Sequence, residues 1–139
     1  MHSPSVPCPE ILVVDDEPAI LNLIAKSLEQ EGFAVTTALD AVEGLRLFEH
    51  NTYAAVISDR MMPHMSGDEL AEAIKTRSPS TPILLISGYC GRYIDITRFD
   101  AFLPKPFTRT QLIAAIQDLL PFSSPVNTPS PPAQGRLSA

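Results

Sequence analysis

Tyr53-Ala54-Ala55-Val56-Ile57-Ser58-Asp59 is an apolar run of small and β-branched residues that ends on a carboxylate. This composition is typical of a buried strand. The next segment, Arg60-Met61-Met62-Pro63-His64-Met65-Ser66-Gly67, contains Pro63 and Gly67, which break regular structure and favour a turn close to Asp59. Together the two segments predict that Asp59 lies at the carboxyl edge of a sheet, where ligands bind in open α/β folds.

A second buried-strand run, Ile11-Leu12-Val13-Val14, ends on Asp15-Asp16-Glu17. One acidic strand end is more often a solvated loop than a site, because exposed carboxylates are common. Two such ends carry more weight, because parallel strands bring their carboxyl ends to the same edge of a sheet. The pattern therefore predicts that these acids and Asp59 share one site.

Helical and strand-like segments alternate along the rest of the chain. Apolar side chains recur every three or four residues in the expected helices, and short apolar runs mark the expected strands. Five strands alternating with five helices predict a parallel sheet that is covered on both faces. The expected helices run from Pro18 to Gly32, from Asp40 to Phe48, from Ser66 or Gly67 onward, within 88–100, and from Thr108 to Leu120; the expected strands are near 11–14, 33–37, 53–59, 83–87 and 101–103.

Local signals refine these elements. Asp40 is a favourable N-cap, and Thr108 with Gln111 has the spacing of a capping box. Pro104 cannot donate a ladder hydrogen bond, so the strand that contains it is expected at an edge of the sheet. Residues 88–100 combine glycines with β-branched residues, which predicts a short or partly unwound helix.

The composition fits one domain of ordinary size. Its 139 residues are 45% hydrophobic and 19% charged, which supports one core and gives no reason to expect disorder throughout. A net charge of -6 argues against direct nucleic-acid binding, which needs clustered cations. No stretch has the pattern of a membrane span or signal peptide, and Cys8 and Cys90 form no C-x-x-C pair, so we expect a cytoplasmic protein without membrane insertion.

The ends of the chain are rich in proline and lack apolar periodicity. We expect residues 1–9 to be a flexible leader and residues 121–139 to be a disordered Pro/Ser-rich tail. The domain is then expected to span residues 10–120. Because the tail is too short for an output domain, we expect a stand-alone protein.

Residues at successive strand ends resemble the receiver domain of bacterial two-component response regulators. They are Asp15-Asp16, Asp59 with Pro63 and Gly67 downstream, Ser87, and Lys105-Pro106-Phe107. The resemblance extends from about Glu10 to Leu120 and implies a flavodoxin-like, doubly wound sheet in the order 2-1-3-4-5, with helices on both faces. Residues 88–104 are about one helical turn fewer than this family usually has between the hydroxyl and the lysine, which implies a shortened fourth helix.

The resemblance implies that Asp59 accepts a phosphoryl group from a sensor histidine kinase or a histidine phosphotransfer domain. Phosphotransfer and autodephosphorylation would be self-catalysed, and the signal would pass to an unidentified downstream protein. Mg²⁺, or Mn²⁺ in its place, would offset the negative charge between the carboxylate and the donor. By the family pattern, the metal ligands would be Asp16, Asp59, Asp15 through water, and the backbone carbonyl of Met61.

Other residues acquire roles through the same resemblance. Lys105 would pair with the phosphoryl oxygens, and Ser87 would donate a hydrogen bond to them and act as a switch, helped by the amides of Arg60 and Gly88. Phe102 would be an aromatic switch that turns inward; a core position in a short strand is an equal alternative for this residue. A cis peptide is implied before Pro106. Arg60 and Tyr89 flank the site, whereas His64 is expected to be a solvated loop residue.

Two other functions fit these residues less well. A phosphatase with an aspartate nucleophile would carry a second Asp two residues after the first, following its first strand, whereas Asp15 and Asp16 are adjacent and Asp59 follows the third strand. A receiver-like scaffold that is not phosphorylated is the remaining alternative. The complete set of acids, hydroxyl and lysine disfavours the scaffold.

Overall fold

A computed structural model describes residues 9–88 and 98–120 of the chain. Its strands and helices follow the expected alternation, with shifts of a few residues at their ends. In chain order they are β1 (Glu10–Val14), α1 (Pro18–Gln30), β2 (Ala34–Ala38), α2 (Ala41–His50), β3 (Ala55–Asp59), α3 (Gly67–Arg77), β4 (Ile83–Ser87), β5 (Ala101–Pro104) and α4 (Arg109–Leu119).

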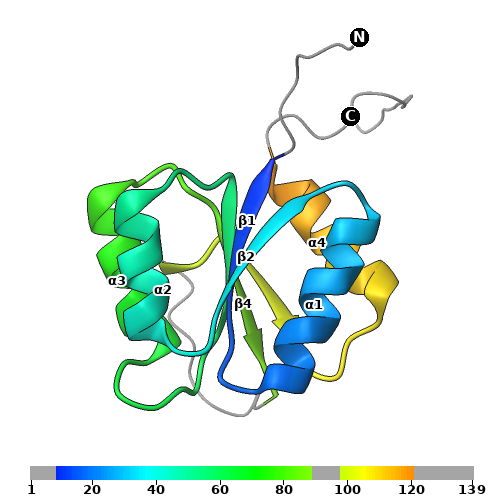
Figure 1. Ribbon diagram of the computed structural model, residues 1–139, viewed down its shortest axis with the longest axis horizontal. Helices are drawn as coiled ribbons and strands as arrows, with labels where there is room; N and C mark the ends of the chain where they lie inside the picture. The colour runs from blue at the N-terminus through cyan, green and yellow to red at the C-terminus, as the bar shows by residue number, and fades with distance from the viewer. Residues whose placement is uncertain (1–8, 89–97, 121–139) are drawn as a thin grey trace, which may run out of the picture.

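The five strands form one parallel sheet in the order β2-β1-β3-β4-β5. Helices α1 and α4 cover one face of the sheet, and α2 and α3 cover the other (Figure 1). The doubly wound, flavodoxin-like fold expected from the sequence is therefore confirmed. Parallel strands need crossover connections, so each helix runs back across the sheet and the strands all end at the same edge.

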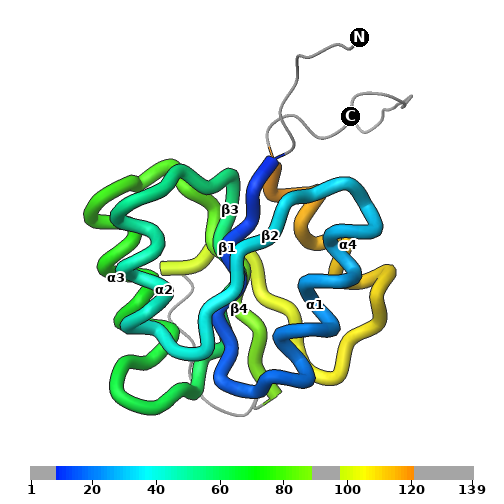
Figure 2. Tube along the Cα trace, viewed as in Figure 1, coloured from blue at the N-terminus to red at the C-terminus, as the bar shows by residue number. Residues whose placement is uncertain are grey.

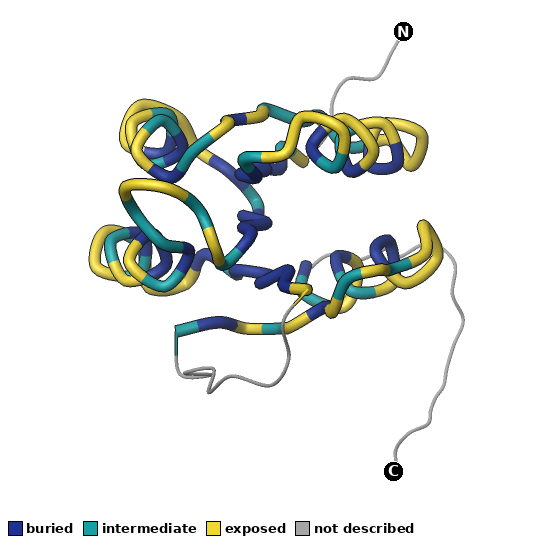
Figure 3. The backbone as a smooth tube through the Cα atoms, turned by 90° about the horizontal axis from the view of Figure 1, so that it is seen from below, coloured by how far each residue is buried: buried dark blue, intermediate teal, exposed yellow. Residues whose placement is uncertain are grey.

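The core is concentrated on the three central strands. Every residue of β3 and β4 is buried, as are the last four residues of β1, because helices cover both faces there. Figure 3 shows these buried strands in the middle and the exposed outer sides of the helices around them. This rigid centre fixes the positions of the side chains that follow the strands.

The observed helix N-caps match the sequence predictions where a short polar residue supplies the cap. Asp40 accepts a hydrogen bond from the Glu43 amide at 2.8 Å, and both Ser66 and Thr108 begin capping boxes. Helix α1 differs, because its N-cap residue is Glu17 and the carboxylate does not cap the helix. The side chain of Glu17 is therefore available for another contact.

Strand β5 corrects one expectation and confirms two others. It pairs only with β4 within the described residues, so Pro104 does lie in an edge strand, and the Lys105–Pro106 peptide is cis. Phe102 is 37% exposed, so the alternative that it is a core residue is wrong. Its neighbours Ala101 and Leu103 face the core instead, because side chains alternate along a strand.

Several expectations concern residues outside the described ranges. These are the leader, the tail, Tyr89, both cysteines and most of the shortened helix within 88–100. Residues 9–88 and 98–120 contain four helices, and none of the four is long and apolar enough to cross a membrane. In Figure 2 the start of β1 and the end of α4 lie together at one end of the sheet.

Candidate functional site

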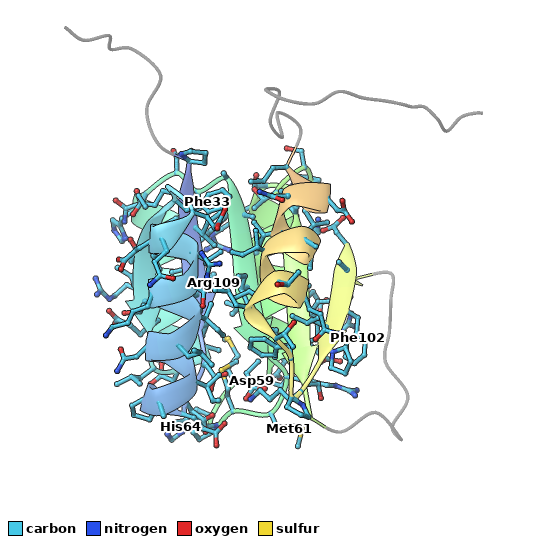
Figure 4. All side chains as sticks on the ribbon, turned by 90° about the vertical axis from the view of Figure 1, so that its right-hand side faces the viewer. Phe33, Asp59, Met61, His64, Phe102 and Arg109 are labelled. Atoms are coloured by element: carbon cyan, nitrogen blue, oxygen red, sulfur yellow. The ribbon has the colours of Figure 1, made fainter. Side chains whose placement is uncertain are left out.

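The carboxyl ends of β1, β3 and β4 meet at one edge of the sheet and carry polar residues. Asp15 follows β1, Asp59 ends β3 and Ser87 ends β4, and all three are buried. Figure 4 shows Asp59 near Met61 and His64 at this edge, and Phe33 at the opposite end of the molecule. The sequence prediction that acids from two strands converge is therefore confirmed for these residues.

The loop after β3 closes tightly over Asp59. The amide of Gly67 donates to the carbonyl oxygen of Arg60 at 2.9 Å, which brings the start of α3 back to the strand end. A Cβ atom on Gly67 would lie 2.4 Å from the Asp59 carbonyl oxygen, so only glycine permits this approach. The Arg60 side chain forms an ion pair with Asp68 of α3 at 3.2 Å, which also ties the loop to the helix.

Lys105 points into the acidic edge from the loop after β5. Its ammonium nitrogen lies 3.4 Å from Asp15 Oδ2, 3.4 Å from Asp59 Oδ1 and 3.3 Å from Glu17 Oε1. The amide of Lys105 also donates to the Ser87 carbonyl oxygen at 2.9 Å, which fixes the backbone of this loop beside β4. One cation thus faces three carboxylates.

Burial sets the protonation of this cluster. Burial, and to a smaller extent the nearby Asp15 carboxylate, raise the pKa of Asp59 to about 6, although Lys105 and the Arg60 amide oppose the shift. Burial also raises the pKa of Asp15. For Lys105, burial lowers the pKa, but the carboxylates of Asp59 and Asp15 outweigh this effect and the net shift is upward. The site therefore carries more negative charge than Lys105 can neutralise.

The acids are suited to a hard divalent cation. One carboxylate oxygen from each of Asp15, Asp16 and Asp59 lies within 4.8 Å of the others. Asp15 Oδ2 is buried and accepts no hydrogen bond from any residue in the described ranges. The long ion pair with Lys105 at 3.4 Å compensates this buried oxygen only in part, and a cation with oxygen ligands would satisfy it. The residues present therefore fit Mg²⁺.

A cavity of about 400 Å³ opens beside these groups. It gives a ligand access to the Asp59 carboxylate, the Ser87 end of β4 and the Lys105 ammonium. Met61, whose backbone carbonyl was expected to be a ligand, also borders it. The cavity is lined by Asp16, Glu17, Asp59, Met61, Ser87, Gly88 and Lys105.

The family model described as the response regulator receiver domain matches residues 11–117. This chain belongs to that family. A relative, response regulator MprA from Mycobacterium sp. strain KMS, is 35% identical over 127 residues, which cover 88% of this chain and 55% of the relative. Transcriptional regulatory protein GlrR from Escherichia coli K12 is 33% identical over 89% of this chain and 28% of the relative. The chain thus spans about half or less of these two relatives.

A solved structure supports the same relationship. Response regulator protein TrrA from Thermotoga maritima, in complex with Mg(2+)-BeF, has a similar structure, with a TM-score of 0.77 and 34% sequence identity. The similarity covers 81% of this chain and 99% of that chain. The shared fold therefore includes nearly all of that chain.

The remaining site predictions have different outcomes. His64 is exposed, as expected for a solvated loop residue. The Arg60 amide, expected to help hold a phosphoryl group, donates to the Ile86 carbonyl oxygen at 3.1 Å within the β3–β4 ladder. Phe102 projects from the edge strand, so its switch role stays a prediction. Glu17 had no predicted role beyond its place in the acidic run, although glutamate at an N-cap position was a signal.

Proposed function

We propose that this domain accepts a phosphoryl group on Asp59 from a phosphohistidine of a sensor histidine kinase or histidine phosphotransfer domain. The observation that supports this most is the position of the Asp59 carboxylate, which faces a 400 Å³ cavity with the Lys105 ammonium 3.4 Å away. With its pKa raised to about 6, the carboxylate is still mostly ionised at neutral pH and can act as a nucleophile.

In the proposed step, a carboxylate oxygen of Asp59 attacks phosphorus. The new O–P bond forms as the N–P bond to the donor histidine breaks, and the electron pair of that bond stays on the imidazole nitrogen, which takes a proton from solvent. Mg²⁺ would supply positive charge between the two anionic reactants when bound. Asp15, Asp16, Asp59 and the Met61 carbonyl would hold this ion, and Mn²⁺ would fit the same oxygen donors.

Lys105 and Ser87 would hold the transferred group. The lysine would exchange carboxylate contacts for phosphoryl oxygens, an attraction of roughly 4 kcal/mol for unit charges about 4 Å apart at an effective dielectric constant of about 20. The Ser87 hydroxyl would donate a charge-assisted hydrogen bond. Attack of water on phosphorus would later release inorganic phosphate and restore the Asp59 carboxylate.

The added charge would then change the surface that a protein partner contacts. We propose Ser87 and Phe102 as the two switch residues, since Ser87 borders the cavity and Phe102 starts from an exposed position on β5. Such a switch requires only a few kcal/mol of bias between two conformations. The stand-alone arrangement stays a prediction, because MprA and GlrR are longer chains.

The first test is phosphorylation in vitro. Purified protein is incubated with Mg²⁺ and acetyl phosphate or phosphoramidate, and its intact mass is measured. We expect one added phosphoryl group that requires Mg²⁺ and is absent from Asp59→Asn. Asp100→Asn is the matched control, because it makes the same chemical change at the opposite edge of the sheet. If wild type and Asp100→Asn gain no phosphoryl group under any of these conditions, the proposal fails and the scaffold alternative is favoured.

A further inference from the structure

Glu17 occupies a helix position that its side chain does not serve. It is the N-cap of α1, where Ser, Thr, Asp or Asn would accept a hydrogen bond from an amide of the first turn. Its carboxylate makes no such bond, and the following Pro18 has no amide hydrogen to offer. Residues that break a local rule tend to lie at functional sites. The role of the Glu17 carboxylate therefore lies in its other contacts.

The contact that Glu17 does make is with Lys105. The ammonium donates a hydrogen bond to Glu17 Oε1 at 3.3 Å. The side chain of Glu17 is 62% exposed, whereas those of Asp15 and Asp59 are 1% and 9% exposed. Glu17 therefore attracts the ammonium toward solvent, whereas the two aspartates attract it inward.

This outward attraction matters because the lysine and a divalent cation would both bind the carboxylates of Asp15 and Asp59. Asp15 Oδ2 and Asp59 Oδ1 each lie 3.4 Å from the ammonium and Glu17 Oε1 lies 3.3 Å from it, so all three contacts are longer than the usual length of about 2.7–2.9 Å for a charge-assisted hydrogen bond. An ammonium in closer contact with them would compete with a cation for both acids. With Glu17 as a third partner, the lysine is shared among three carboxylates. Asp15 Oδ2 accepts no hydrogen bond from the described residues.

We propose that Glu17 is a positioning residue that holds Lys105 at the mouth of the cavity while Asp59 is unphosphorylated. In this position the lysine leaves the inner carboxylate oxygens accessible to a divalent cation. The second half of the inference rests on the proposed function: once Asp59 carries a phosphoryl group, Lys105 leaves Glu17 for the phosphoryl oxygens. Glu17 then contributes to forming the phosphorylated state and not to maintaining it.

Metal binding tests the first half without phosphorylation. The apparent Mg²⁺ dissociation constant of the full chain is measured by amide chemical shifts for wild type, Glu17→Gln and Glu17→Asp. Aspartate keeps the charge but is one methylene too short to reach Lys105. We expect both variants to weaken Mg²⁺ binding about two- to fivefold, the range for a partly exposed ion pair. Glu29→Gln is the control, because it removes the same charge from the exposed far end of α1.

A double-substitution cycle identifies Lys105 as the intermediary. In a Lys105→Met background, Glu17→Asp should no longer change the Mg²⁺ dissociation constant, because there is no ammonium left to position. Wild-type affinity in Glu17→Asp, or an undiminished effect of this substitution without Lys105, would overturn the inference. The first result would mean that Glu17 acts only through its charge or not at all, and the second that it affects the metal site without Lys105.

Phosphorylation tests the second half. With acetyl phosphate at subsaturating Mg²⁺, Glu17→Asp should form the phosphorylated protein more slowly than wild type, whereas the lifetime of its phosphoryl group should stay within about twofold. A lifetime shortened as much as formation is slowed would overturn the exchange of partners. If wild type accepts no phosphoryl group, the proposed function fails, and the Mg²⁺ cycle still decides the role of Glu17.

Discussion

Both edges of the sheet hold a lysine among oxygen acceptors, but the two clusters are built differently. At the edge where the strands begin, Lys75 donates to the Thr81 carbonyl oxygen and to Asp100 Oδ2, each at 2.7 Å. Asp100 Oδ2 also accepts from the Ile83 amide at 2.8 Å. At the edge where the strands end, Lys105 is no closer than 3.3 Å to any of its three carboxylate partners.

The difference separates a cluster that stabilises the fold from one that is ready for a ligand. The Lys75 cluster pairs one cation with one anion and ties α3 to the starts of β4 and β5. In the Lys105 cluster one cation faces several acids. Burial raises the pKa of Asp59 to about 6, and Asp15 Oδ2 accepts no hydrogen bond in residues 9–88 and 98–120. Unfavourable electrostatics of this kind is compensated when a cation binds.

The largest expected effect is that Asp59→Asn stabilises the protein. Without divalent cations, we expect the free energy of unfolding above pH 7 to rise by about 2–3 kcal/mol. The pKa of Asp59 moves from 3.8 to about 6 on folding, so the cost in stability grows as the pH rises between these values and is fully present above the folded value. As the pH falls through 6 toward 4, the folded carboxyl regains its proton and the cost disappears. Urea denaturation at pH 7.5 and pH 4.5 measures both values.

The controls for this prediction use pH and metal. The advantage of Asp59→Asn over wild type should shrink at pH 4.5, and saturating Mg²⁺ should reduce it at pH 7.5 by stabilising wild type. An advantage independent of pH would show that the buried charge of Asp59 is not its cause. A loss of stability at pH 7.5 would remove the contrast between the two edges.

Replacing the aspartate at the other edge should have the opposite effect on stability. We expect Asp100→Ala to lower the free energy of unfolding by about 2 kcal/mol, because it leaves the Ile83 amide without its acceptor and Lys75 without its partner. Asp100→Asn should cost less, about 0.5 kcal/mol, because the amide oxygen can still accept from Ile83 and the ion pair is partly exposed. Urea denaturation of both variants beside Asp59→Asn gives the comparison.

Asp100→Asn and Asp59→Asn each remove one negative charge from the same protein. A general effect of the net charge of -6 would therefore act equally on both. If Asp100→Asn stabilised the chain as much as Asp59→Asn, overall charge repulsion would explain both results, and the distinction between the edges would be refuted.

The sequence was sufficient for the fold and for the residues that follow its strands. Asp15 and Asp59 could be placed at one edge because parallel strands end together. Asp40 and Thr108 could be identified as helix caps because short polar side chains accept hydrogen bonds from nearby amides. These are local signals or direct consequences of topology.

The contacts that distinguish the two edges were not predictable in this way. Lys75 and Asp100 are 25 residues apart, and Lys105 and Glu17 are 88 apart. Their pairing depends on helix placement and on side-chain rotamers, which no periodicity encodes. The exposure of Phe102 was ambiguous for a related reason. In a four-residue strand, a shift of one residue in register decides which face of the sheet a side chain occupies.

The smallest expected effect concerns backbone strain at the two edges. Within the described ranges, two residues have positive φ: Gly32 with φ 97° between α1 and β2, and His64 with φ 72° in the loop after Asp59. Glycine adopts this conformation without steric cost, whereas a residue with a Cβ atom pays about 1–2 kcal/mol. We expect His64→Gly to stabilise the chain by about 0.5 kcal/mol, the relief of strain less the larger chain entropy of glycine in the unfolded state.

Gly32→Ala is the matched substitution, and we expect it to destabilise by about 1 kcal/mol even though a Cβ atom there would meet nothing within 4 Å. Urea denaturation of both variants without Mg²⁺ measures the sign of each change in the free energy of unfolding. Equal and small effects at both positions would mean that the loop after Asp59 carries no more strain than the turn before β2. Opposite signs would place the strain, like the unneutralised charge, at the edge that holds Asp59.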